Sequence, residues 1–597
     1  MFKKIFSLFV VTVIVFTSTM AGTKSYVAPK QKLPAKAEVI APAKTEYVSG
    51  ARKTSPHRDS PNDLSWIMVD SMPNVYGVSI ADANPLCYDP WNNHVAMIYR
   101  GAQNYNPPNA TTGSLWYGAS PDEFGTWNRV GKINADVDQY GRYPSSAISN
   151  PNHSSTPADA IFEYSYPHLT GGSAFGSLGY GLDPFLQNTP FTTIVDADYS
   201  SQTYIWTDES TPYVYFLAER TGPPALVELW VTPNQGETWS VAKTWDVATE
   251  WTSLWGERGQ TVGNTVYVEA TVYDSLAFGA ASPWVPAFTK STDNGTTWSE
   301  WELVDWRTIP VLSNYDEVGT NDGRIAHDFV VDANGMEHWF CSVIDTNPSP
   351  DVMDIVEVFR TASGWDANII ARRTLSFVPG FAALTQMDNE LFATISEDRT
   401  AFAIKWVDAP AEGETQGDIF AAGRKLGQGW GPAWNLTQTN DGYGREMSTH
   451  LATRCENPTG NLLTIYVTKT EQLAVVPDSM LDDTQPCAIW GSKYVLDITT
   501  GIQERESGLP SGFALYRNYP NPFNPSTKIA FDIPSAMNVS LKIYDVTGKE
   551  LETLYNGYQQ AGKYEAVFNA SKYASGVYLY KLQAGSFSAT EKMILTK

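Results

Sequence analysis

A pattern that recurs about every 60 residues constrains the fold of this chain more than any other feature. A Gly-Arg pair that leads into an extended segment stands at Gly141–Arg142, Gly323–Arg324 and Gly444–Arg445. The arginines are 182 and 121 residues apart, which is close to three and two periods of about 60. A fixed period of this length predicts a series of similar units, each too small to bury an apolar core alone.

Each unit contains a short strand, a turn and a strongly apolar strand, the pattern of a β-hairpin. Seven such hairpins are expected to turn at Asp89–Pro90, Asn150–Pro151, Asp208–Glu209, Gly263–Asn264, Asp332–Gly335, Asp388–Asn389 and Asn457–Gly460. With two further strands per unit, residues 61–500 are predicted to form an all-β, seven-bladed β-propeller. Six blades are the alternative. Trp66–Val69 precedes the first unit and is expected to complete the last one.

The segment from Ser291 to Trp298 reads Ser-Thr-Asp-Asn-Gly-Thr-Thr-Trp. Asp293 and Gly295 supply turn chemistry, because Asp bonds to its own backbone and Gly accepts a positive φ. The segment resembles the Asp-box of BNR-type repeats in sialidase-like β-propellers. The resemblance implies a fastener between the outer strands of a blade rather than a catalytic element.

Two weaker copies of this segment occur. Thr232–Trp239 has Asn234 in place of the aspartate and keeps the glycine as Gly236, while Ser120–Trp127 reads as one residue longer. If the resemblance holds, Trp127, Trp239 and Trp298 should be buried at equivalent places in different blades. The six-bladed alternative corresponds to the sialidases themselves.

The N-terminus has the features of a secretory signal peptide. Lys3 and Lys4 precede an apolar run over residues 5–16 and a small-residue site that ends at Ala21, so residues 1–21 are predicted to be removed on export. Residues 22–60 are rich in Lys, Ala and Pro, a composition typical of a disordered spacer. No later run approaches the roughly 20 apolar residues of a membrane span.

Charge and cysteine usage limit the partners. The net charge of −24 argues against binding nucleic acid or anionic membranes. No cofactor is expected, structural Ca²⁺ stays an alternative, and no Cys-x-x-Cys or His-x-x-x-His spacing predicts a metal site. Cys455 and Cys487 fall in one repeat, and whether they pair after export is left open.

The last 85 residues differ from the repeats. After a polar segment at 501–512, period-2 strands separated by turns predict a small Ig-like antiparallel β-sandwich over residues 513–597. Tyr519–Thr527 (Tyr-Pro-Asn-Pro-Phe-Asn-Pro-Ser-Thr), the Asp545–Gly548 turn and Gly576–Lys581 resemble the C-terminal sorting domain of type IX secretion substrates. The resemblance implies a secreted or cell-surface protein whose tail is recognised by the type IX secretion machinery, with 501–512 as a linker.

Four arginines are candidates for ligand binding. Arg142, Arg324 and Arg445 precede the innermost strands of their units, and Arg258 lies at a similar place. Guanidinium groups that face one funnel would suit a carboxylate or sulfate ligand. The alternative is that each arginine braces a neighbouring blade. His327 and His450, just inside two blades, are either polar funnel residues or ordinary strand histidines.

No catalytic set can be assigned. The Arg-Ile-Pro sequence of sialidases has only an interrupted counterpart at Arg307–Pro310, and no Ser-His-Asp or phosphate-loop motif is present. The sequence therefore favours a secreted propeller that binds a glycan or protein at its funnel. An extracellular glycan-active enzyme, a sialidase-like glycoside hydrolase or a lyase, is the alternative.

Overall fold

The computed structural model describes most of the chain from residue 66 onward. The described residues are 66–72, 83–101, 113–134, 140–170, 174–208, 210–220, 225–247, 253–274, 284–317, 327–345, 352–361, 364–372, 391–408, 418–431, 433–437, 447–472, 487–498, 502–506, 510–534, 537–559, 562–570, 573–585 and 587–596. The predicted signal peptide and spacer, Arg324 and Arg445 lie outside them. Within these ranges, no helix has the length and apolar character needed to span a membrane.

Strands dominate the described residues. The first sheet contains β2 (Leu86–Asp89), β3 (His94–Arg100), β4 (Leu115–Ser120) and β5 (Asn128–Lys132). The second contains β6 (Ser145–Ser149), β7 (Ile161–Thr170), β8 (Ala174–Pro184) and β9 (Phe191–Asp196). The third contains β10 (Tyr199–Thr207), β11 (Val214–Arg220), β12 (Leu226–Thr232) and β13 (Ser240–Asp246). The fourth contains β14 (Ser253–Val262), β15 (Thr265–Tyr273), β16 (Trp284–Ser291) and β17 (Glu302–Leu303).

Three more sheets follow in the ring. The fifth contains β18 (Tyr315–Glu317), β19 (His327–Val331), β20 (Glu337–Asp345), β21 (Val352–Thr361) and β22 (Gly364–Arg372). The sixth contains β23 (Phe392–Ser396), β24 (Ala401–Asp408), β25 (Asp418–Lys425), β26 (Trp434–Asn435) and β28 (Arg454–Cys455). The seventh contains β27 (Met447–Leu451), β29 (Leu462–Gln472), β30 (Cys487–Asp497) and β1 (Ile67–Met72). Short 3₁₀ turns occur at η2 (Pro157–Asp159), η3 (Trp306–Thr308) and η4 (Pro310–Leu312).

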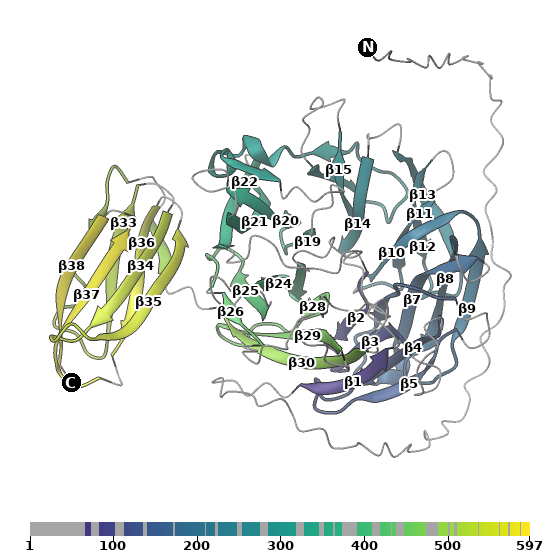
Figure 1. Ribbon diagram of the computed structural model, residues 1–597, viewed down its shortest axis with the longest axis horizontal. Coiled ribbons are helices and arrows are strands. Elements are labelled where there is room, and N and C mark those ends of the chain that lie inside the picture. The colour runs from purple at the N-terminus through teal and green to yellow at the C-terminus, as the bar shows by residue number, and fades with distance from the viewer. Residues whose placement is uncertain are drawn as a thin grey trace, which may run out of the picture.

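The seven sheets of the described part of residues 67–497 surround a common centre (Figure 1). Their innermost strands are neighbours in the order β2, β6, β10, β14, β19, β23 and β27, and β28 contacts β2 again. β1 pairs with β30 at the outer edge of the last sheet, so the expectation that the N-terminal strand completes the last unit is confirmed. The ring thus closes because its first strand in the sequence, β1, pairs with its last, β30.

The apolar core of the ring lies between the sheets. Seven clusters of buried side chains are each shared by two neighbouring sheets, including the pair formed by the last and first sheets. Alternate side chains of a strand face opposite neighbours, so most ring strands are buried on both faces. Each unit therefore depends on both of its neighbours for its core.

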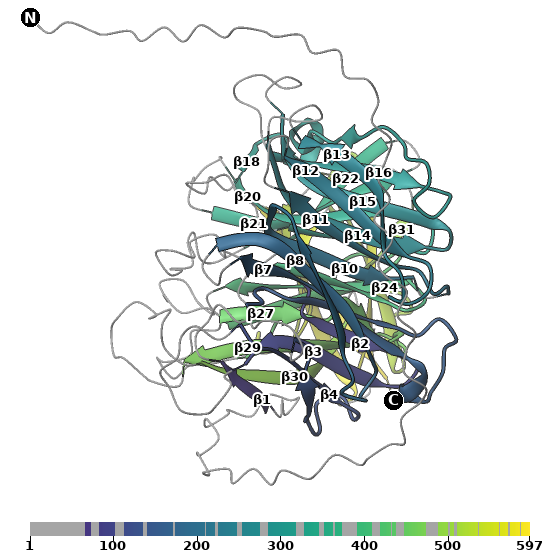
Figure 2. The same ribbon diagram turned by 90° about the vertical axis from the view of Figure 1, so that its right-hand side faces the viewer.

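The ring has two faces (Figure 2). We call the face where the innermost strands begin the start side, and the face where they turn into the second strand the hairpin side. The expected hairpins are found in every unit except the sixth. There the apolar segment expected as the second strand is the innermost strand, β23, and the turn is at 397–400. The turn expected at Asp388–Asn389 lies outside the described residues. Within them the inner hairpin turns one strand later than expected, because two apolar strands of similar length look alike in sequence.

The 291–298 segment is a hydrogen-bonded turn between β16 and β17. Ser291 Oγ donates to Asp293 Oδ1 (2.7 Å) and accepts from the Gly295 amide (2.8 Å), and Asp293 accepts from the Thr297 amide (2.7 Å). Gly295 has a φ of 90°, a conformation that favours glycine. Trp298, the last residue of the segment, donates from Nε1 to the Gly295 carbonyl (2.9 Å).

The two weaker copies repeat this bonding. In one, Thr232 and Asn234 replace Ser291 and Asp293. In the other, the Phe124 amide donates to Ser120 Oγ (2.7 Å), and Phe124 has a φ of 67°. Phe124 therefore takes the glycine position, and this copy has the same length as the others. The prediction of a copy one residue longer was wrong, because it put Gly125 rather than Phe124 at the glycine position.

The three tryptophans occupy equivalent places at different depths. Each packs in the interface between its own sheet and the preceding one. Trp239 is 4% exposed, whereas Trp127 and Trp298 are half-buried. The three side chains thus lie at equivalent places, as predicted, but only Trp239 is fully buried.

The tail forms two four-stranded sheets beside the ring (Figure 1). One contains β31 (Ile502–Glu506), β36 (Gly562–Asn569), β33 (Ser526–Ile533) and β32 (Ala514–Leu515). The other contains β35 (Glu550–Gln559), β34 (Met537–Tyr544), β37 (Gly576–Ala584) and β38 (Phe587–Leu595). A single apolar cluster drawn from residues 513–595 fills the space between them, so the tail has its own core.

The structure corrects the predicted linker and answers the question that the sequence left open about two cysteines. The segment 501–512 is not wholly a linker, since β31 pairs antiparallel with β36 of the tail. Cys455 and Cys487 are both buried and are not joined in a disulfide. They lie on β28 and β30, in different sheets, because the seventh unit shares its β28 segment with the sixth sheet.

Candidate functional site

Asp or Asn side chains close the inner hairpins on the hairpin side. In each, Oδ1 accepts a hydrogen bond from a backbone amide a few residues further on, which fixes the turn. These side chains are Asp89, Asn150, Asp208, Asp332 and Asp398. The recurrence explains why polar residues stand at the end of apolar strands, and it leaves the second oxygen or nitrogen of each side chain for other contacts.

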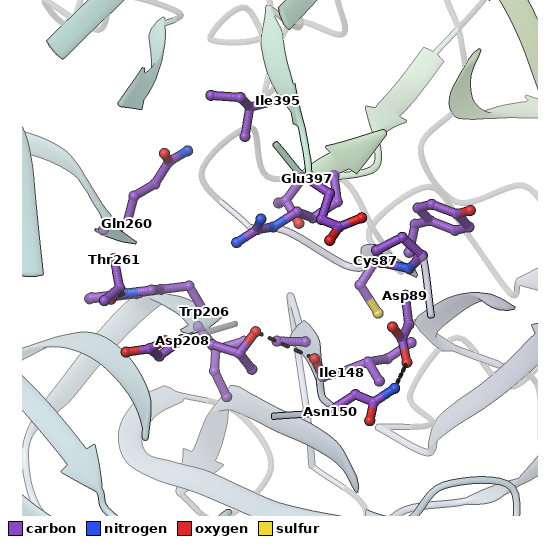
Figure 3. Close-up of a pocket in the computed structure, with 18 of the residues that line it drawn as sticks. Cys87, Asp89, Ile148, Asn150, Trp206, Asp208, Gln260, Thr261, Ile395 and Glu397 are labelled. Carbon is purple, nitrogen blue, oxygen red and sulfur yellow. Dashed lines mark hydrogen bonds between the residues drawn. The ribbon is translucent and has the colours of Figure 1, made fainter. Parts of the chain in front are cut away.

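These turns surround a pocket of about 70 Å³ at the centre of the hairpin side (Figure 3). Its walls come from six strands, β2, β6, β10, β14, β23 and β28, and from the turns that follow them. The charged and aromatic residues that line it are Asp89, Asp208, Glu397, Arg399, Arg454, Tyr88, Trp91, Tyr204 and Trp206. Three carboxylates, two guanidinium groups and four aromatic rings thus meet in a volume that holds a few water molecules.

Asp89 is 3% exposed and links two sheets. Its Oδ2 accepts from Asn150 Nδ2 at 2.7 Å, as Figure 3 shows. Burial raises the pKa of Asp89 to about 6, against the lowering effect of the Asn150 hydrogen bond. Burial also raises the pKa of Glu397 at the rim of the pocket. Both carboxyl groups are therefore easier to protonate than free ones.

Arg399 is a strut between three sheets. It stands in the turn of the sixth sheet with a φ of 54°, and its guanidinium donates to the carbonyls of Val331 (2.8 Å) and Thr261 (2.7 Å). A further bond joins it to Gln260 Oε1 (3.2 Å). Burial lowers its pKa to about 10, so it stays charged at neutral pH. Its donors are largely used in holding the ring together.

Asp208 differs from Asp89 in the hydrogen bonding of its second carboxylate oxygen. It is 3% exposed, and Oδ1 accepts from the amide (2.8 Å) and hydroxyl (3.0 Å) of Ser210. Oδ2 is buried without a hydrogen-bond partner among the described residues. Its charge raises the pKa of Arg454 and Arg399 in opposition to the effect of burial. A carboxylate oxygen in this position is costly unless something donates to it.

Aromatic rings line two sides of the pocket. Trp206 is 7% exposed and donates from Nε1 to Thr261 Oγ1 at 3.0 Å. Trp91 is half-buried and stacks on His153, with ring centroids 3.9 Å apart. The pocket therefore offers flat apolar surface as well as charged groups.

The start side carries a different set of groups, around Arg142. Its guanidinium is half-buried and donates from Nη1 to the carbonyl of Gly141 (2.8 Å); it forms no ion pair with any carboxylate that the structure describes. Arg100, at the end of β3, is 2% exposed. Burial and the charge of Arg142 lower the pKa of Arg100 to about 9. Two cations thus lie close together at this face.

Arg258 and His327 are occupied in the core. Arg258 is 1% exposed; its Nε lies 3.2 Å from Asp328 Oδ1 and its Nη2 donates to the carbonyl of His327 (2.9 Å). His327 Nε2 lies 3.3 Å from Glu269 Oε2. These residues brace the fourth and fifth sheets and are not open to a ligand. Of the predicted arginines, only Arg142 faces the start side among the described residues.

His450 is also an interior residue. It is 2% exposed on β27 and packs against the ring of Phe392, at a centroid distance of 5.1 Å. In the described ranges no group of three or more His, Cys, Asp or Glu side chains is arranged to hold a metal ion. The structure therefore places none of the predicted histidines in a pocket.

Sequence reasoning named none of the pocket's charged groups as site residues. Asp89 and Asp208 were recognised only as turn residues, and Glu397, Arg399 and Arg454 not at all. The usable signal was positional: an Asp or Asn at the end of five of the seven inner strands implies that these side chains converge once the units form a ring. The arginines carry no such repeat, so only the fold brings them there.

Comparison with protein families identifies the tail. Residues 517–596 match the secretion system C-terminal sorting domain. The tail is a sorting domain. It indicates export by type IX secretion to the cell surface or the surroundings, as its sequence had implied. No curated protein matches the chain in sequence.

Solved structures resemble the ring only distantly. The α-L-arabinofuranosidase Arb93A of Fusarium graminearum is 10% identical, with 72% of this chain and 98% of that chain covered and a TM-score of 0.34. The phage phi92 endosialidase is 9% identical, with 77% and 72% covered and a TM-score of 0.33. The SapL1 lectin is 9% identical, with 62% and 99% covered and a TM-score of 0.35. Similarity at this level assigns no activity to the ring.

Proposed function

We propose that this exported protein is a seven-bladed β-propeller that binds an acidic extracellular ligand, a glycan or a protein, on its start side. The blade number is supported by seven sheets and seven interface clusters in the described residues, joined end to end by the contact of β28 with β2. A density map that resolved six or eight sheets would contradict it.

The observation that carries the ligand proposal is the state of Arg142. A guanidinium has five N–H donors in a planar fork that fits a carboxylate or sulfate. Within the described residues, the Arg142 guanidinium donates one hydrogen bond, to its own Gly141 carbonyl, and Arg100 adds a second positive charge nearby. An anionic ligand would relieve the repulsion between these cations. It would do so although the chain as a whole has a net charge of −24.

Binding to an array of acidic glycans tests this proposal. The mature chain should bind carboxylated or sulfated glycans, and Arg142→Ala should weaken that binding at least tenfold. Arg307→Ala is the matched control, because Arg307 is already paired with its own neighbour Asp305 (3.2 Å). Loss of binding in both variants, or in neither, would contradict the assignment to Arg142.

An extracellular glycoside hydrolase is the second candidate. It is favoured by Asp89 and Glu397, two carboxyl groups with raised pKa in one pocket, since such enzymes pair a protonated acid with a carboxylate. A panel of fluorogenic glycosides distinguishes the candidates. Turnover that is lost in Asp89→Asn and kept in Arg142→Ala would establish the enzyme and displace the binding proposal.

We also infer that the ring folds without the tail. The tail's core contains no ring residue, and β31 assigns the boundary to the stretch between β30 and residue 502. A chain ending at residue 498 should keep the melting temperature of the ring domain and remain inside the cell. Normal release of this fragment would show that export does not need the tail.

A further inference from the structure

We propose that the pocket on the hairpin side is a second binding site, which takes a small neutral group with adjacent hydroxyls: a free polyol or the end of a neutral glycan. This site is separate from the start side and does not rest on the ligand proposed there.

The first argument is the unfilled hydrogen-bond capacity of Asp208. Its Oδ2 is buried and unpartnered among the described residues, while Oδ1 is used by Ser210. An unpartnered buried acceptor requires a donor. A hydroxyl group donates to Asp208 and can still accept a second bond.

The second argument is charge balance. Asp89, Asp208 and Glu397 face Arg399 and Arg454 across one small pocket. An added anion would meet three carboxylates, and an added cation would meet two guanidinium groups. A neutral ligand with several polar atoms meets neither repulsion, and its hydroxyls can lie between groups of opposite sign.

The third argument is size and surface. A volume of about 70 Å³ admits a group of a few heavy atoms rather than a whole oligosaccharide. Trp206 forms part of the wall, and half-buried Trp91 is its more accessible aromatic member. Aromatic rings give the C–H face of a polyol an apolar surface to pack on. The ligand class is thus a short diol or hydroxymethyl unit, with any remaining sugar outside the pocket.

The test measures binding of small probes to the full mature chain. Binding is detected by saturation-transfer NMR and quantified by calorimetry, in buffer that contains EDTA. The probes are glycerol, erythritol, a panel of neutral methyl glycosides, and the charged sugars glucuronate and glucosamine. Neutral probes should bind and the charged ones should bind at least tenfold more weakly. Saturable binding of glycerol or erythritol would identify a free polyol site, and binding of methyl glycosides alone would identify a glycan end.

Asp208→Asn is the decisive variant. Asn keeps Oδ1 for the Ser210 turn and replaces the unpartnered oxygen with an NH₂ donor. Affinity for the neutral probe should fall at least tenfold at an unchanged melting temperature. Asp545→Asn is the matched control, because Asp545 makes the same kind of turn in the tail. Arg142→Ala should leave polyol binding intact, which separates this proposal from the function proposed for the start side.

Three outcomes would overturn the proposal. The first is no saturable binding of any neutral probe, which would mean that the pocket holds water only. The second is unchanged affinity in folded Asp208→Asn. The third is stronger binding of glucosamine or of glucuronate than of the neutral sugars, which would make the site one for a charged ligand.

Discussion

The two faces of the ring use their charged groups differently. On the hairpin side, Arg399 donates to backbone carbonyls of two other sheets, and Asp89 is tied to Asn150. On the start side, Arg142 has no carboxylate partner among the described residues and bonds to its own chain. In this ring, these charged groups are therefore structural where the inner hairpins meet and available where the strands begin. Asp208 is the exception on the hairpin side.

The hairpin side should be the more sensitive face to mutation, and its turns give the largest effect. Trp239→Ala removes a side chain that is 4% exposed and packs against Phe216 at a centroid distance of 4.8 Å. We expect a loss of about 3–5 kcal/mol from the aromatic cavity. Trp298→Ala, at the equivalent but half-buried place, should cost about 1–3 kcal/mol. Urea unfolding of the two variants measures the difference, and equal losses would refute the depths assigned to these turns.

Replacing Arg399, which bridges three sheets, should have the next largest effect on stability. Arg399→Met keeps the length of the side chain but leaves the Val331 and Thr261 carbonyls without their donor. We expect a loss of about 2–4 kcal/mol. Arg142→Ala should change stability by less than about 0.5 kcal/mol. If thermal denaturation gave the two arginines the same cost, the contrast between the faces would be lost.

A smaller, pH-dependent effect is expected at Glu163. Both carboxylate oxygens of Glu163 are buried and unpartnered among the described residues, and burial raises its pKa well above the usual value. A raised pKa in the folded state favours folding below the pKa of the unfolded chain, and this contribution is lost as the pH rises. Glu163→Gln should therefore gain stability over the wild type as the pH increases from about 4.5.

Urea unfolding at several pH values between 4.5 and 8.5 measures this trend. Glu300→Gln provides the control, because Glu300 is exposed and water solvates its carboxyl group in the folded and the unfolded chain alike. A constant difference between Glu163→Gln and the wild type would mean that Glu163 does not titrate on folding in this range.

Much of the fold could be predicted because it repeats. A period of about 60 residues, alternation of apolar side chains and Asx turns specify strand, turn and ring together. The errors arose where the signal was local. In the 120–127 turn, the prediction put Gly125 at the position of positive φ, which Phe124 holds. The sixth hairpin was predicted one strand too early.

The candidate sites were harder to predict, for physical reasons. Arg142, Arg258, Arg324 and Arg445 look alike in sequence, yet Arg258 is buried against Asp328 and Arg142 is not. Pairing with a residue 70 positions away is set by how neighbouring sheets pack, and no single repeat encodes it. The pocket likewise depends on six strands from distant parts of the chain.

The most direct test of the account is a comparison of two variants with two ligands. Calorimetry measures the affinity of the mature chain for an acidic glycan and for a neutral methyl glycoside, in wild type, Arg142→Ala and Asp208→Asn. We predict that Arg142→Ala loses at least tenfold affinity for the acidic glycan alone, and that Asp208→Asn loses as much for the neutral probe alone. Parallel losses for both ligands in either variant would contradict the presence of two distinct sites at the two ends of the ring.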